Sequence, residues 1–366
     1  MSVSSAGNFQ LQGGITLGNA VTINGTGTSG NGAIQNFAGN NTLSGSLTVA
    51  GSSRIESDAG TLTLGGNVGL GSSSLNVGGN ANTNISGVIS GSGGISKDGA
   101  GTLTLSASNT YTGATAVNAG TLVLGANNVL ANTTAVSVAA GATFDVNGKT
   151  DTIGSLSGAG TLAIASGTLI AGNATNTTFS GSLTGNGTLT KQGSGVLTLS
   201  SNTSFGGDVN VTGGTLEFTA TLPSIAGTLT LGAGSTLRLT GASLAVGTLH
   251  ITGNTVLDFG GSSASILNAT NFIIDAGVTL VSVTNWTNAS DYFYAQGWSG
   301  STLGTRGLGS ETQVTFAGSS SSQTAWLSYD HQITPAPEPA TYGAVLMGAA
   351  LAVIGLRRRK SRRAAQ

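Results

Sequence analysis

The sequence contains no cysteine, two histidines and four prolines, and few of its residues are charged or aromatic. The lack of cysteine excludes disulfides, thiolate metal sites and cysteine nucleophiles. Charged residues make up 7 % of the chain, compared with about 25 % in a typical globular domain. Because only two histidines occur among many serines, no Ser/His/Asp arrangement can be singled out. The composition therefore argues against an ordinary globular enzyme.

The formal net charge of −1 hides a difference between the two parts of the chain. Six of the 12 basic residues lie from position 357 onward, and all 13 acidic residues precede that position. The body therefore carries 6 − 13 = −7, and the C-terminal tail carries +6. An acidic and weakly charged body is a poor binder of a phosphate backbone, so we expect no nucleic acid as a partner.

In place of charge the chain has 61 glycines and 38 % hydrophobic residues, and the latter alternate regularly. In the segment 97–125, Leu103 and Leu105 alternate with threonines, and Leu122 and Leu124 repeat this spacing. Such a period of two is typical of a short strand with one buried face. The Gly, Asn, Ser and Thr residues between these runs are the residue types that form turns.

The same stretch recurs along the chain. Segment 86–106 aligns with segment 180–200, so that Lys97 corresponds to Lys191 and Leu103 to Leu197. A unit that repeats in this way cannot bury its apolar face alone and must stack on its neighbours. If a coil takes roughly 20–25 residues, about a dozen coils fit, and at ~4.8 Å per stacked strand they form a rod roughly 60 Å long.

Residues 97–105 (KDGAGTLTL) and 109–113 (NTYTG) closely resemble the autotransporter-associated β-strand repeat of bacterial passenger domains. The resemblance is good over about 81–218 and looser elsewhere. It implies an exported, all-β protein with a right-handed parallel β-helix (β-solenoid), which we expect over residues 1–260. The chain departs from the autotransporter pattern because too few residues follow position 260 for a translocating barrel of many strands.

Residues 261–334 differ in composition, since they hold all three tryptophans, Trp286, Trp298 and Trp326. The open end of a solenoid exposes strand edges and apolar core, which large aromatic side chains can cover. We interpret this segment as an aromatic-rich β cap. The alternative interpretation is an aromatic platform that binds sugars.

Residues 335–366 form a third region, which begins with a proline-stiffened linker. The segment 340–356 has no charge, and as a helix it would span about 26 Å of a bilayer core of ~30 Å. We expect a single transmembrane helix here, with the body on the far side of the membrane from the basic cluster that follows. That cluster consists of Arg357, Arg358, Arg359, Lys360, Arg362 and Arg363. The alternatives are a buried C-terminal helix and a tail that binds nucleic acid.

The order of Pro337-Glu338-Pro339, the apolar segment and the arginines resembles a PEP-CTERM sorting signal. The resemblance implies recognition and cleavage by exosortase, a membrane-embedded cysteine protease of Gram-negative bacteria. The body would be anchored transiently in the inner membrane, in the periplasm, and then reach the outer surface or the exopolysaccharide matrix. The residues after Met1 have no basic start and no apolar core, so we expect a signal peptide in frame upstream of Met1.

Acidic residues offer only weak candidates for chemistry. Glu56 and Asp58 would share one face of a strand, yet a solvated turn explains them more simply. Asp145, Asn147 and Asp151 are spaced like calcium ligands, but the glycine and glutamate that an EF-hand loop requires are missing.

The two histidines are no stronger as candidates. His250 is expected on the outward side of a strand, and His331 follows Asp330 near the linker. We therefore expect no catalytic, cofactor or metal site.

Together these observations predict an exported, non-catalytic repeat protein of the cell surface or polysaccharide matrix, which acts in adhesion or in biofilm and floc formation. Its expected partners are exosortase, the membrane, and exopolysaccharide or cell-surface glycans. The alternative is a β-helical polysaccharide lyase or hydrolase, which would need carboxylates clustered in one groove.

Overall fold

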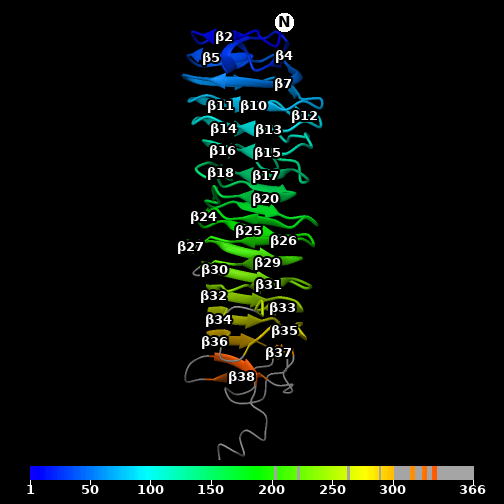
Figure 1. Cartoon of the computed structure of the whole chain (residues 1–366), viewed down its shortest axis with the longest axis vertical. Coiled ribbons are helices and arrows are strands. Elements are labelled where there is room, and N and C mark those ends of the chain that lie inside the picture. Colours follow the sequence, from blue (N-terminus) through cyan, green and yellow to red (C-terminus); the bar gives the residue numbers. More distant parts are fainter. Residues whose placement is uncertain are drawn as a thin grey trace, which may run out of the picture.

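The computed structural model describes residues 1–201, 204–220, 223–261, 264–287, 290–300, 314–317, 324–327 and 332–335. These residues form a stack of short β-strands wound coil on coil into a straight rod (Figure 1). The rod is a parallel β-solenoid of the right-handed type with about 13 coils. At ~4.8 Å per coil its length is roughly 62 Å. The expected all-β parallel helix is confirmed.

Each coil contributes strands to three faces, which we number in the order that the chain visits them. The first face holds β1 (Ser2–Val3), β4 (Val21–Gly25), the start of β7 (Leu47–Ser57), β9 (Val68–Gly69), β12 (Ile89–Ser90), β19 (Thr150–Ile153), β22 (Thr168–Ala171), β25 (Thr188–Lys191), β28 (Asp208–Val211), and the second halves of β30 (Ser224–Leu231), β32 (Ser243–Ile251), β34 (Ile266–Ile274) and β36 (Tyr292–Gly300).

The second face is the most continuous. It holds β2 (Phe9–Gln12), β5 (Ile34–Ala38), the end of β7, β10 (Leu75–Gly78), β13 (Ile95–Lys97), β15 (Thr115–Val117), β17 (Ala135–Val138), β20 (Ser155–Gly158), β23 (Thr177–Phe179), β26 (Val196–Leu199), β29 (Thr215–Phe218), β31 (Thr236–Leu239), β33 (Thr255–Asp258), β35 (Val281–Thr284) and β37 (Val314–Phe316).

The third face closes each coil. It holds β3 (Thr16–Leu17), β6 (Asn41–Leu43), β8 (Thr61–Leu64), β11 (Asn82–Ile85), β14 (Thr102–Leu105), β16 (Thr121–Leu124), β18 (Thr143–Asp145), β21 (Thr161–Ala163), β24 (Ser182–Thr184), β27 (Ser204–Phe205) and the first halves of β30, β32, β34 and β36. One short 3-10 turn, η1 (Thr28–Gly30), lies between β4 and β5, and the described residues contain no α-helix.

The alternation seen in the sequence fills the core. On the third face Leu64, Ile85, Leu105 and Leu124 lie directly above one another in the parallel register. All four are at most 1 % exposed, and burying each such side chain stabilises the fold by about 1.5–3 kcal/mol. Thr63 and Thr104, each between two buried leucines of one strand, point outward, which confirms the expected strands with one buried face.

The sequence repeat does not return to the same face. Lys97 lies on the second face, in register with Val77 and Val117. Its counterpart Lys191 lies on the first face, in register with Ala171 and Val211. The repeated unit is therefore a strand, a corner and the next strand, and it fits any corner because all three faces have the same inward and outward alternation.

Two coils have no strand on the first face, between β12 and β19. Some backbone bonds between coils persist there, as from the Asn109 N–H to the Val129 carbonyl (3.0 Å), and side chains add to them. Asn109 Oδ1 accepts from the Ile89 N–H (2.8 Å), and Asn109 Nδ2 donates to the Val129 carbonyl (2.9 Å). Asp151 Oδ2 then accepts the N–H groups of Val129 (2.7 Å) and Leu130 (3.1 Å). Buried backbone groups must find partners, and these two side chains supply those that the remaining backbone bonds do not.

The solenoid continues past residue 260, since β32, β34 and β36 pair in parallel across that point. Phe272 packs against Phe293 and Trp298 inside these coils, and Trp286 contacts Phe259 and Phe316 edge to face. These aromatics therefore pack in or against the coil interior, and the separate aromatic cap expected over 261–334 is not supported. The domain boundary at residue 260 stays a prediction.

Two further strands, β38 (Thr324–Leu327) and β39 (Gln332–Pro335), follow the last coil. They pair antiparallel with each other, and β39 pairs antiparallel with β36. Within the described residues no helix is long and apolar enough to cross a membrane. The transmembrane helix expected at 340–356 lies outside those residues.

Candidate functional site

A groove lies along the corner between the third and first faces, where β30, β32, β34 and β36 bend from one face to the other. We call it the elbow groove. Its volume is about 310 Å³. The residues that line it are Ser224, Ile225, Ala226, Ala245, Val246, Gly247, Asn268, Thr270 and Gln296. In Figure 1 these four strands lie one below the other toward the end of the rod away from the N-terminus.

Small residues at the bends let the coils approach closely enough to form this corner. A Cβ atom on Gly247 would lie 2.1 Å from the Ala226 carbonyl oxygen, and one on Gly227 would lie 2.4 Å from Asp208 Oδ1. The register between β30 and β32 shifts between Ile225 and Thr228, which marks the bend. Glycine is the residue type that permits such close backbone contact.

The elbow groove is polar but uncharged. Ile225 and Val246 are 3 % exposed and belong to the core beneath it. The side chains of Asn268, Thr270 and Gln296 are exposed, and none of them makes a hydrogen bond within the described part of the chain. The groove therefore presents amide and hydroxyl groups over a floor of small apolar residues.

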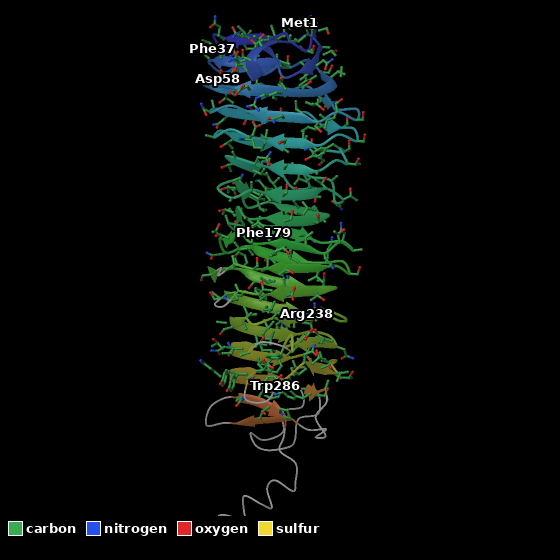
Figure 2. The ribbon with its side chains drawn as sticks, in the orientation of Figure 1. Met1, Phe37, Asp58, Phe179, Arg238 and Trp286 are labelled. Atoms are coloured by element: carbon green, nitrogen blue, oxygen red, sulfur yellow. The ribbon has the colours of Figure 1, made fainter. Side chains whose placement is uncertain are left out.

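The carboxylates that the sequence suggested as a pair are held separately. Glu56 accepts from Arg54 Nη2 (3.2 Å), and the same guanidinium contacts Asp98 (2.8 Å). Asp58 instead accepts from Gln35 Nε2 (2.6 Å), nearer the corner of the coil. Figure 2 shows Asp58 near the end of the rod that holds Met1. The two carboxylates thus belong to two surface networks and do not form an acid and base pair.

The residues spaced like calcium ligands also lie apart. Asp145 Oδ1 accepts from the Asn147 N–H (2.7 Å) in a turn where Asn147 has a φ of 50°. Asp151 is fully buried, and its carboxylate joins neighbouring coils as described above. Burial raises the pKa of Asp151, whereas its backbone hydrogen bonds lower it. Across the described segments no three His, Asp or Glu side chains gather as a metal site.

His250 lies on the outward side of the first face, as expected, and its Nε2 is 2.8 Å from Asp275 Oδ1. His331 lies outside the described residues. The same is true of Pro337, Glu338 and Pro339 and of the basic cluster 357–363, so nothing in the structure tests the sorting signal.

Sequence reasoning aligned Lys97 with Lys191 but gave neither a role. Both are buried, at 2 % and 1 % exposed. Lys97 Nζ donates to the carbonyls of Asp98 (2.8 Å), Gly99 (2.8 Å) and Ala119 (3.2 Å). Lys191 repeats the arrangement in its own corner, at 2.7, 3.0 and 3.1 Å.

Each ammonium group thus uses its three donors on three corner carbonyls. Burial lowers the pKa of Lys97 to about 8, and the nearby Asp98 raises it in part. The signal that could have revealed this role is the lysine followed two residues later by glycine, which recurs at both places.

Both corner lysines lie in segments that are similar to a known protein family. Residues 95–137 and 189–218 match the family model of the passenger-associated-transport-repeat. These two segments are thus similar to passenger-type repeats. Each matched segment begins two residues before the corner lysine, on β13 and on β25.

A relative in Brucella suis biovar 1 (strain 1330) bears the name "Adhesin BmaC autotransporter", and it is 35 % identical over 141 residues. The aligned stretch covers 36 % of this chain and 4 % of the relative. No solved structure matches the chain significantly. The matches support a passenger-like repeat, which agrees with the repeat expected from the sequence.

Proposed function

We propose that this passenger-like chain is an exported, non-catalytic protein of the cell surface or the extracellular polysaccharide matrix, with a role in adhesion or in biofilm and floc formation. The observation that carries the proposal is the match of two segments to passenger repeats, together with the partial identity to an autotransporter named as an adhesin. Because the aligned stretch is 4 % of that relative, the adhesive role enters here as a proposal.

The physical character of the rod supports a structural role. Some of its outward charges form ion pairs, as in Arg54 with Asp98 and Arg238 with Asp258, both at 2.8 Å. The carboxylates that a lyase or hydrolase would need are tied into separate networks or buried between coils. A β-helical polysaccharide lyase or hydrolase is therefore the weaker candidate.

The proposed route to the surface rests on the C-terminal sequence alone. Exosortase would recognise Pro337-Glu338-Pro339, hold the chain through the apolar segment 340–356 and the basic cluster, and cleave near the motif. The proposal predicts that the mature protein lacks the arginine cluster. Mass spectrometry of the mature C-terminus combined with subcellular fractionation tests it.

A matched pair of variants sharpens this test. Changing Glu338→Ala together with Pro339→Ala should leave the full-length precursor in the inner membrane. Pro335→Ala, in the same linker but outside the motif, should be processed normally. An intact C-terminus on protein at the cell surface would show that sorting does not use this signal.

The role in adhesion needs a separate test on cells. A strain that lacks the protein should attach to surfaces or form flocs less than its parent, and the full chain should restore the behaviour. Unchanged attachment and floc formation would contradict the proposed role.

A further inference from the structure

The elbow groove has a chemical character that points to a ligand. None of its nine lining residues carries a charge. Ala226, Ala245 and Gly247 give it a small apolar surface, while Asn268, Thr270 and Gln296 line it with exposed amide and hydroxyl groups. Sites of this kind orient a neutral polar ligand through a few hydrogen bonds over an apolar surface.

The elbow groove runs along the rod axis. Its lining residues come from four successive strands, β30, β32, β34 and β36, which pair coil to coil. Three steps of ~4.8 Å place these residues over roughly 14 Å along the rod axis. A ligand that contacts all four strands must itself be extended and lie parallel to the axis. That shape suits a linear polymer better than a compact small molecule.

Aromatic side chains flank the groove on the third face. Tyr294 is in register with Asn268, and its ring lies parallel to that of Tyr292, with an angle of 6° and 5.8 Å between centroids. Tyrosine combines an apolar ring with a polar hydroxyl, which suits partners that present both kinds of surface. The C–H faces and hydroxyl groups of a pyranose have this combination.

We infer that the elbow groove binds a neutral polysaccharide chain along the rod axis. The lack of charge among the lining residues disfavours uronic acid polymers and charged peptides, and the exposed amides supply donors and acceptors for sugar hydroxyls. This inference adds a ligand class to the proposed function. It rests on that proposed function for its biological setting, whereas the binding itself is argued from the groove residues.

Two groove variants and two matched controls test the inference on the purified full chain. Ala245→Leu fills the groove, and Ala135→Leu makes the same change at another exposed strand position, on the second face. The double variant Asn268→Ala/Thr270→Val removes polar groups from the groove. Asn84→Ala/Thr104→Val removes the same groups from neighbouring coils of the third face.

Isothermal titration calorimetry with cellohexaose, maltohexaose and laminarihexaose measures binding, and hexagalacturonic acid serves as the charged comparator. Thermal melts confirm that each variant is folded. We expect at least one neutral hexasaccharide to bind, the groove variants to weaken it by tenfold or more, and the controls to leave it unchanged.

Equal binding by the groove variants would place the ligand elsewhere on the rod and overturn the inference. Binding of the acidic hexasaccharide alone, or of none of the four, would also overturn it. The cell assays of attachment remain independent of these results. A strain that attaches normally without the protein would refute the proposed role in adhesion but not the binding of polysaccharide in the groove. Poor attachment without the protein, combined with equal binding by the groove variants, would refute only the groove inference.

Discussion

At the scale of single residues, the buried lysines show how this chain uses one of its few charges. Lys97 lies 2 % exposed inside a corner with three carbonyl partners. An isolated ammonium group would be costly to bury, but here each of its hydrogen atoms has an acceptor. The lysine thus satisfies carbonyl groups that the strands leave unpaired at the corner.

Replacing Lys97 by methionine keeps the length of the side chain but removes all three donors. The carbonyls of Asp98, Gly99 and Ala119 then lose a partner, so we expect the free energy of unfolding to fall by about 1–3 kcal/mol. Lys149→Met is the control, because Lys149 is partly exposed and such changes usually stay within about 0.5 kcal/mol. Urea denaturation followed by circular dichroism measures both. Equal stabilities for the two variants would show that the corner does not depend on its lysine.

The same lysine predicts a dependence on pH. Burial lowers the pKa of Lys97 from its ordinary value of 10.5 to about 8. Between these values the unfolded chain binds more protons than the folded one, so the free energy of unfolding should rise as the pH increases from 8 to 10.5. The quantity to measure is the difference in unfolding free energy between the protein and its Lys97→Met variant across this range. A difference that stays constant would contradict the prediction.

At the scale of elements, the strands were predictable but their placement was not. The alternation around Leu103 and Leu122 fixes which side chains point inward, because a period of two allows one answer. It does not say which of three similar faces a strand joins. For this reason the sequence could align Lys97 with Lys191 without revealing that they lie on different faces.

The elbow groove could not be predicted from the sequence for a related reason. It depends on the register of four strands that are about one coil apart in the sequence, and on bends at positions such as Gly247 and Thr270. The prediction of an aromatic cap over 261–334 failed for a different reason. Trp298 belongs to an ordinary strand and packs inward against Phe272, so its composition alone could not separate core from cap.

The lack of a first-face strand in two coils leads to a prediction about Asp151. Its carboxylate satisfies two buried N–H groups where two coils have no strand. We expect Asp151→Ala to lower the free energy of unfolding by about 1.5–3 kcal/mol, because hydrogen bonds to a charged group are lost and buried donors are left unpaired. Hydrogen exchange at Val129 and Leu130 should also become faster.

Asp145→Ala is the matched control for this prediction. Asp145 accepts one hydrogen bond from an exposed turn, so its loss should cost about 1 kcal/mol or less and leave exchange at Val129 unchanged. Similar effects of the two substitutions would mean that Asp151 does not replace the missing strands.

At the scale of the whole molecule, the rod shape follows from the stacking of coils. Each coil buries a few small apolar side chains against its neighbours, so the chain can extend along one axis without a large globular core. The result is a rod with a few ion pairs on its outer faces and an uncharged groove along its axis. Such a shape suits a protein that projects from a surface or spans a matrix.

The absence of native cysteine allows a direct test of this stacking, because spin labels can be attached to introduced thiols alone. Thr42, Thr63 and Thr184 lie in one outward column of the third face. The column runs through Asn84, Thr104, Val123, Asp145 and Ala163, six coil steps from Thr63 to Thr184.

The measurement is the distance between labels in the pairs Thr63→Cys/Thr184→Cys and Thr42→Cys/Thr184→Cys, by double electron–electron resonance. At ~4.8 Å per step the two backbone separations are about 29 Å and about 34 Å. The account predicts narrow distributions near these values, with the second pair longer by about one step. Broad distributions, or a second distance no longer than the first, would contradict a solenoid of stacked coils.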